Sequence, residues 1–473
     1  MDSISVFEII KVGIGPSSSH TMGPWIAGKK FIQYISKHTP NITDIIEIKT
    51  YLFGSLAKTG IGHGTDIALV MGLTNEDYTT INTTTIPAKI EQIKITKLLK
   101  IGANYAIHFD YNNDIIFEWN TILPYHPNGI RFITLLKNGQ QIIKEYFSVG
   151  GGFVVSLNED TENNIKITTP YPCHNAASIL QNCNQLNLSI SQLVLLNETA
   201  WRPANQTKLN ALIIWEEIKQ CIYRGVHTEG ILPGGLNVNR RAFSMNKQLL
   251  KEKTYSNINE WLNLIKTGVQ DFNAVNKWVS VFALAVNEEN ASFGRIITAP
   301  TNGASGVIPA VLMYAYCFTS NFTEEQVVQF ILTAGEIGTL YKKGATISAA
   351  MGGCQAEIGV SSSMAAAGLT EALGGSKEQV LQAAEIAMEH HLGLTCDPIG
   401  GLVQIPCIER NAMGAIKAIT ASNLSFESDV NLAFVSLDNV IKTMWQTALD
   451  MNSKYKETSE AGLAKISVNN PAC

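Results

Sequence analysis

The hydrophobic pattern of this chain changes at about residue 185, and this change constrains the fold more than any other feature. From about residue 44 to 150, short β-rich runs alternate with turn residues, and the helical stretches between them are few. After 185 the apolar residues recur at helical spacing. The sequence therefore predicts two domains: an N-terminal α+β domain (1–155), a linker (156–185) and a mainly α-helical domain (186–473).

Several elements of the N-terminal half can be predicted individually. We expect a helix over 22–37 and a strand over IIEIKTYLF (45–53). We expect a hairpin over 107–119 that turns at Asn112–Asn113, and a clearer hairpin over 130–147. Asn138-Gly139 suits a type I′ turn in the second hairpin. The polar stretch SLNEDTENNIK (156–166) is typical of a linker.

In the second half, two helix starts are marked by a capping box. Thr323 and Gln326 form one, and Ser376 and Gln379 form the other. The second of these helices should end at Gly393, where glycine can take the left-handed conformation. Between them lies GATISAAMGGCQAEIGVSSSMAAAG (344–368), whose small residues allow close approach of helices or leave room for a bulky group.

Composition excludes several function classes. The net charge is −5 and there is no basic run, so nucleic acid is not an expected partner. The N-terminus lacks the pattern of a signal peptide, and the longest apolar runs are too short to span a bilayer, so no membrane partner is expected and the cytoplasm is the predicted location. In a reducing compartment the eight cysteines are not interpreted as a disulfide framework.

Three cysteines lie beside glycine or proline in the helical half. Cys354 follows two glycines, Cys396 lies in LGLTCDPIGG, and Cys407 lies in VQIPCIERN. Loop amides in such places can stabilise the charge of thiolates that hold a cluster. No C-x-x-C spacing is present, and spacing alone favours buried structural cysteines over a metal site.

Three polar loops contain further candidates. GPSSSHTMGP (15–24) places hydroxyls around His20, and TGIGHGTD (59–66) places His63 between two glycines. A loop histidine can move a proton, although each motif alone is equally compatible with an ordinary turn. APTNGASG (299–306) places Asn302 and Gly303 where they could bind an anionic substrate, or simply form a helix entry.

Together these segments resemble the iron–sulfur L-serine dehydratases over nearly the whole chain, in the form that has both family regions on one polypeptide. The motifs are SSSHTMGP, GHGTD, APTNGASG, GGCQAEIGVSSSMAAAG and HHLGLTCDPIGGLVQIPCIERN. The resemblance implies a [4Fe–4S] cluster and no pyridoxal phosphate. It implies that Cys354, Cys396 and Cys407 hold the cluster, and that Cys473 at the C-terminus ligates the fourth iron until substrate displaces it.

The implied reaction converts L-serine to pyruvate and ammonia, with an open iron acting as a Lewis acid on the hydroxyl. We expect His63 to remove the Cα proton, since the ordinary pKa of imidazole near 6.5 suits a base at neutral pH. The substrate carboxylate would be held by Ser17, Ser18, Ser19, His20 and Thr21, with help from Asn302 and Gly303. The site should then lie between the two domains. A homodimer is expected from the resemblance.

The N-terminal domain also resembles the allosteric substrate-binding domain of some phosphoglycerate dehydrogenases. His126 and Asn128 in LPYHPNGIRF (123–132) could bind serine as an activator, or could form an ordinary turn.

Three other functions were weighed. A pyridoxal-phosphate dehydratase would use the glycines of SVGGGF (148–153) and a lysine such as Lys342 or Lys343, although that loop does not lead into an evident helix start. A non-catalytic amino-acid sensor and an electron carrier are the other two alternatives.

Overall fold

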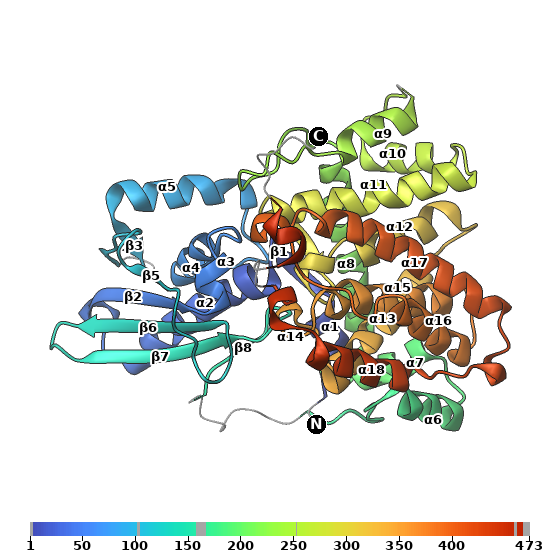
Figure 1. Ribbon diagram of the computed structural model, residues 1–473, viewed down its shortest axis with the longest axis horizontal. Helices are drawn as coiled ribbons and strands as arrows, with labels where there is room; N and C mark the ends of the chain where they lie inside the picture. Colours follow the sequence, from blue (N-terminus) through green and yellow to red (C-terminus); the bar gives the residue numbers. More distant parts are fainter. Residues whose placement is uncertain (1–2, 102–104, 158–166, 252, 458–460, 467–473) are drawn as a thin grey trace.

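The computed structural model describes residues 3–101, 105–157, 167–251, 253–457 and 461–466 (Figure 1). The strands are β1 (Lys11–Ile14), β2 (Ile45–Phe53), β3 (Leu98–Lys100), β4 (Ala106–His108), β5 (Ile115–Glu118), β6 (Gly129–Leu136), β7 (Gln141–Ser148), β8 (Val154–Val155) and β9 (Arg295–Thr298). The first helices are α1 (Val6–Ile9), α2 (Gly23–His38), α3 (Ser55–Thr59), α4 (Thr65–Leu73) and α5 (Ile86–Thr96).

From residue 176 the described chain is almost entirely helical. The helices are α6 (Ala176–Leu186), α7 (Ile190–Glu198), α8 (Ala204–Gly225), α9 (Ala242–Leu250), α10 (Ile258–Lys266), α11 (Phe272–Ala291), α12 (Val307–Phe318), α13 (Glu324–Gly344), α14 (Ala349–Gly352), α15 (Ile358–Ala372), α16 (Lys377–Glu389), α17 (Cys407–Glu427) and α18 (Leu437–Asp450). The predicted fold class, an α+β part followed by a helical part, is confirmed. Within the described residues, none of these helices combines the length and hydrophobicity that a membrane span requires.

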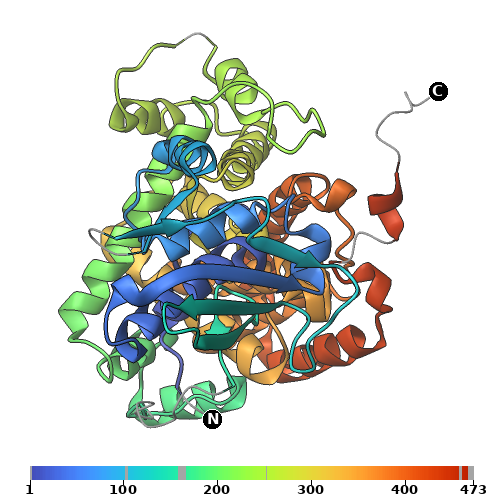
Figure 2. The same cartoon turned by 90° about the vertical axis from the view of Figure 1, so that its left-hand side faces the viewer.

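The N-terminal part is built on a five-stranded mixed sheet in the order β5-β2-β6-β7-β8. β2 pairs parallel with β5 and antiparallel with β6, and β6 pairs antiparallel with β7. Helix α2 covers one face, where Phe31 stacks on Phe132 with ring centroids 4.4 Å apart. Figure 2 shows this sheet in front of the helical part.

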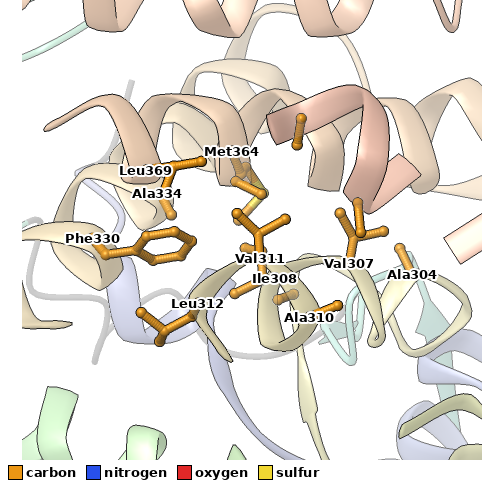
Figure 3. Packing of buried hydrophobic residues seen from close by; sticks show 14 of the residues in the cluster. Ala304, Val307, Ile308, Ala310, Val311, Leu312, Phe330, Ala334, Met364 and Leu369 are labelled. Carbon is orange, nitrogen blue, oxygen red and sulfur yellow. The ribbon is translucent and has the colours of Figure 1, made fainter. Parts of the chain in front are cut away.

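The helical part packs around α15, which contacts α12, α13, α16 and α17. Every residue of α15 is buried, because its alanines, glycines and serines let neighbouring helices approach closely. In Figure 3, Val311 and Ile308 of α12 lie near Phe330 of α13 and Met364 of α15. The small-residue stretch therefore serves helix packing along most of its length.

The first residues of the chain belong to the helical core rather than to the sheet. Val6, Ile9 and Ile10 are buried in the same hydrophobic cluster as the helices α7 to α17. β1 then pairs antiparallel with β9, from Lys11 opposite Thr298 to Ile14 opposite Arg295. The pairing of β1 with β9 connects the two parts of the chain. The predicted domain boundaries at 155 and 185 stay a prediction.

The expected hairpin over 107–119 is wrong. β4 pairs with β3 in a separate small sheet, whereas β5 pairs parallel with β2 in the five-stranded sheet. The chain turns between them because the Asp114 carboxylate accepts a hydrogen bond from the Asp110 amide at 2.7 Å. This side-chain turn redirects the chain instead of closing a hairpin.

The 130–147 hairpin is confirmed as β6 and β7, but its turn is not type I′. Gly139 has φ of 83°, whereas Asn138 is not among the residues with positive φ, and a type I′ turn needs both. Both capping boxes are confirmed, at the starts of α13 and α16. Helix α16 ends at Glu389, earlier than expected, and Gly393 lies in the following turn with φ of 80°.

Candidate active site

The Ser17–Thr21 segment lies between β1 and α2. Ser17 starts a short π-helical turn (Ser18–Met22), with its Oγ accepting from the His20 amide at 3.1 Å. Thr21 Oγ1 donates to the carbonyl of His63 at 2.8 Å, which joins the two histidine loops. All five residues of the segment are buried, so their hydroxyls line an interior site rather than a surface turn.

His20 is fixed through both ring nitrogens. Its Nδ1 lies 2.8 Å from Ser19 Oγ, and its Nε2 lies 3.0 Å from Ser55 Oγ at the start of α3. Burial holds the pKa of His20 well below 6.5, and the nearby His63 and His126 lower it further, while the Ser55 contact raises it. His20 is therefore neutral at working pH and positioned by hydroxyl partners.

His63 lies against His20, with ring centroids 4.7 Å apart. Its Nδ1 lies 2.9 Å from the Thr59 carbonyl oxygen, and burial lowers its pKa to about 4. The next residue, Gly64, has φ of 58°, and a Cβ there would lie 1.9 Å from Phe293 Cζ. A glycine is thus required beside His63, as the glycine-flanked motif indicated.

Three thiols from separate segments gather near these histidines. Cys354 opens a 3₁₀ turn after α14, Cys396 lies in the loop after α16, and Cys407 is the first residue of α17. One sulfur each from Cys354 and Cys396 and a carboxylate oxygen of Glu357 lie within 4.8 Å of one another. Burial raises the pKa of Cys407 well above 9, and the nearby Cys354 raises it further, so this third thiol lies near the other two.

Arg410 supports this group of cysteines. It lies one turn into α17, and its Nη1 donates to Cys354 Sγ at 3.3 Å and to the Thr395 carbonyl at 2.6 Å. Its Nη2 lies 3.3 Å from Asp397 Oδ1. A guanidinium beside the Cys354 sulfur would balance part of the charge of thiolates that hold a metal.

The donor set therefore fits a metal centre held by thiolates. The other described cysteines (Cys173, Cys183, Cys221 and Cys317) are buried, and burial raises the pKa of each to about 11 or above. Arg224 lies beside the Cys221 sulfur, but these four cysteines are outside the group formed by Cys354, Glu357 and Cys396. Soft thiolate ligands suit iron–sulfur clusters and zinc.

A segment near the C-terminus, residues 455–457, lies beside Cys396. Lys456 pairs with Cys396 in a parallel bridge, and the Cys396 amide donates to the Tyr455 carbonyl at 2.8 Å. Glu457 follows with φ of 58° and a buried side chain whose Oε1 lies 3.7 Å from His20 Nδ1. Burial and the charge of Glu357 raise the pKa of Glu457 well above 4.5. Cys473 lies outside the described residues.

The remaining predicted site residues lie around this centre. Both polar atoms of the Asn302 amide have protein partners. Its Nδ2 donates to the Ile14 carbonyl at 2.6 Å, and its Oδ1 accepts from Thr298. Gly303 faces Glu357, whose Oε2 lies 2.8 Å from where a Cβ would be. Asn302 therefore orders the β1–β9 junction, and its second N–H and second lone pair leave the predicted substrate contact open.

His126 is near the histidine pair rather than remote from it, because its charge lowers the pKa of His20. Its Nδ1 accepts from the Asn128 amide at 3.1 Å, and the Asn128 side chain donates to the Ser148 carbonyl at 3.2 Å. An allosteric role for this pair stays a prediction.

Sequence reasoning missed Glu357, Arg410 and Glu457. The first two follow a predicted cysteine by three residues, a spacing that keeps side chains on one side of a helical turn, so they could have been found. Glu457 carries no such signal, because only the fold brings its segment to Cys396.

Comparisons with known proteins agree over the whole length. The family model "Serine dehydratase beta chain" matches residues 5–159, and "Serine dehydratase alpha chain" matches residues 185–464. The chain is 47% identical over 466 residues to L-serine dehydratase of Haemophilus influenzae, covering 98% of each chain. It is 46% identical to L-serine dehydratase TdcG of Escherichia coli and 44% identical to L-serine dehydratase of Streptomyces coelicolor, again over 98% of each chain.

Proposed function

The chain belongs to the serine dehydratase family, and from this membership we propose that it converts L-serine to pyruvate and ammonia at a [4Fe–4S] cluster between its two parts. The observation that carries the proposal is the meeting of Cys354, Cys396 and Cys407 beside the buried pair His20 and His63. The enzyme is a lyase.

Cys354, Cys396 and Cys407 would hold the cluster, and Arg410 would balance part of the thiolate charge. We propose Cys473 as a fourth, displaceable ligand on the strength of the resemblance alone. When bound, the cluster supplies an open iron as a Lewis acid for the serine hydroxyl, which is otherwise a poor leaving group.

His63 is the proposed base for the Cα proton. The Thr59 carbonyl can only accept, so Nδ1 carries the hydrogen and the lone pair is on Nε2. Within the described residues nothing hydrogen-bonds to that Nε2. The pKa of about 4 makes His63 a weaker base than an exposed imidazole, but it stays unprotonated throughout the neutral range.

His20 and the Ser17–Thr21 hydroxyls are the proposed substrate contacts. The loop is buried and held by internal hydrogen bonds, so it needs little reorganisation on binding. Loss of the Cα proton and the β-hydroxyl leaves aminoacrylate, which tautomerises to an imine and hydrolyses in water to pyruvate and ammonia. We keep His126 and Asn128 as candidates for a place where serine binds as an activator.

Two further proposals concern location, which rests on the sequence pattern, and assembly, which rests on the resemblance. We propose a cytoplasmic location and a homodimer. Sedimentation of the intact protein would test the second, and a monomer at working concentration would contradict it.

The decisive experiment uses protein purified without oxygen. We expect about four irons and four sulfides per chain, and pyruvate from L-serine. Cys354→Ser, Cys396→Ser and Cys407→Ser should each lose iron and activity together, whereas Cys317→Ser, a buried cysteine in α12, should keep both. An iron-free wild type that binds serine without turnover, and that iron and sulfide do not restore, would favour the amino-acid sensor instead.

A further inference from the structure

The loop between β7 and β8 contains three consecutive glycines that have no role in the proposed chemistry. Gly150, Gly151 and Gly152 have φ of 93°, 59° and 73°, and all three are buried. Two backbone hydrogen bonds close the loop. The Val149 amide donates to the Phe153 carbonyl, and the Phe153 amide donates to the Gly150 carbonyl. Within the described residues, the amides of the three glycines themselves have no hydrogen-bond acceptor. Consecutive unpaired amides in a buried turn form a concavity suited to an anion.

Two lysines from different parts of the chain lie at this loop. Lys11 of β1 has its Nζ 4.4 Å from the centre of the Phe153 ring, and Lys342 of α13 has its Nζ 2.6 Å from the same centre. Lys11 Nζ also lies 3.6 Å from where a Cβ on Gly152 would be. Neither ammonium makes a hydrogen bond or an ion pair with any residue that the structure describes.

The electrostatics of the lysines agree with a missing anion. Burial lowers the pKa of Lys342 to about 7 and that of Lys11 to about 8. The charge of Lys11 lowers the pKa of Lys342 further, and Glu8 is the nearby charge that raises both. A bound anion would offset the unfavourable burial of these two ammonium groups.

A buried hydroxyl completes the arrangement. Ser348 is only 4% exposed, and its Oγ has no hydrogen-bond partner. That Oγ lies 3.5 Å from where a Cβ on Gly150 would be, so it faces the loop. A buried hydroxyl that lacks a partner costs free energy, which a bound acceptor would recover.

The loop adjoins the candidate active site. Ser148, just before it, donates through Oγ to the Ser19 carbonyl at 2.8 Å, and Ser348 immediately precedes the short helix that leads to Cys354. A small molecule bound at the loop would therefore lie beside the Ser17–Thr21 segment.

We propose that the amides of Gly150–Gly152, the ammonium groups of Lys11 and Lys342 and the hydroxyl of Ser348 form a binding site for the carboxylate of L-serine. The assignment rests on the proposed function, because it takes its ligand from it. A carboxylate is the anionic group that the proposed substrate would bring to this loop. The packing of both lysines on Phe153 alone would not account for three unpaired amides and an unpaired hydroxyl.

The test is trace acetylation of the intact, anaerobically purified enzyme, with the modified lysines measured by mass spectrometry. The His63→Ala variant is used so that L-serine is not consumed. L-serine should slow acetylation of Lys342 and Lys11 several-fold, and inorganic phosphate should not. Lys343 is the internal control, because it follows Lys342 on the same helix but donates to the Cys173 carbonyl at 2.9 Å. Its acetylation should not respond to L-serine.

A variant pair gives the second measurement. Lys342→Met should raise the KM for L-serine about tenfold or more, the usual loss for one charged hydrogen bond, with a smaller effect on kcat. Ser348→Ala should raise the KM less, and Lys343→Met should leave it near the wild-type value. Iron content measured alongside shows whether each variant keeps its cluster.

Each outcome decides the proposal. No protection by L-serine in His63→Ala, while the wild type turns over serine, would overturn the site and leave the proposed function intact. Protection by phosphate equal to that by L-serine would overturn the carboxylate assignment. Protection by L-serine in a wild type that makes no pyruvate would support the site while the proposed function fails.

Discussion

The Nδ1 of His63 lies 2.9 Å from the carbonyl oxygen of Thr59, one turn earlier in the chain. A carbonyl cannot donate, so this contact fixes the tautomer and leaves the Nε2 lone pair for another partner. The Thr21 hydroxyl in turn donates to the His63 carbonyl at 2.8 Å, so the loop is held from both sides. The ring orientation is thus set by the fold before substrate arrives.

Removing this imidazole should abolish turnover without disturbing the cysteine centre. We expect His63→Ala to lower kcat by about 10²–10⁴-fold, the usual contribution of a positioned general base. Iron content and the visible spectrum should stay at wild-type values. His390→Ala is the matched control, since that exposed histidine also bonds a helical carbonyl through Nδ1, at 2.9 Å, and lies at the end of α16. Near-normal pyruvate formation by His63→Ala would exclude it as the base.

Acid should destabilise the protein through its buried neutral histidines. Burial lowers the pKa of His391 to about 4 from 6.5, so in the window between these values the unfolded chain binds the proton and the folded chain does not. The stability from this group is complete above pH 6.5 and is lost as pH falls toward 4. At pH 5 the loss is roughly 2 kcal/mol.

His391→Asn tests this, because an asparagine amide can replace the Nδ1–H bond to the Ala387 carbonyl, 2.7 Å in the wild type, without titrating. Denaturant unfolding at pH 7.5 and pH 5 should show a smaller drop in the free energy of unfolding for the variant. An identical drop in both proteins would mean that His391 is already charged in the folded state.

The sequence predicted local structure well where the signal lies within the segment. The capping boxes at Thr323 and Ser376 and the strand over 45–53 are all present. It failed at 107–119, where two β-rich runs adjacent in the chain pair with different strands. Pairing partners depend on long-range contacts, which a local pattern does not encode.

The candidate site also contains some residues that have a local signal in the sequence and others that only long-range contacts place there. Glycine and proline beside His63 and the three cysteines marked them as candidates in the sequence, but only the resemblance assigned the cysteines to a cluster, because their spacing alone favoured structural cysteines. The motif around Asn302 suggested a ligand contact, which stays a prediction, but it did not indicate the hydrogen bonds that this amide makes with Ile14 and Thr298. Glu457 reaches the site only through its bridge to Cys396, so no local pattern could reveal it.

The backbone before Cys354 should tolerate no side chain. Gly353 has φ of 72°, and a Cβ there would lie 2.8 Å from the Leu394 carbonyl oxygen and 2.9 Å from Met451 Sδ. Gly353→Ala should therefore displace Cys354 and lower the iron per chain several-fold. Gly139→Ala is the control: it has φ of 83° in the β6–β7 turn with no atom within 4 Å, so it should lose only about 1 kcal/mol of stability and keep its iron. Full iron content in Gly353→Ala would remove Cys354 from the ligand set.

Arg410 should control how firmly the cysteine centre holds its metal. Its planar guanidinium spans Cys354 Sγ and the Thr395 carbonyl from one nitrogen and Asp397 from the other, so it ties together two of the three cysteine segments. A lysine keeps the charge but cannot present this fork. We expect Arg410→Lys to release iron to a chelator about 10–100-fold faster than wild type, as for other lost partners of metal ligands. Arg131→Lys, which alters a half-exposed pair with Glu145 on the sheet, should release iron at the wild-type rate. Equal rates for Arg410→Lys and wild type would show that Arg410 anchors only the loop and does not stabilise the thiolates.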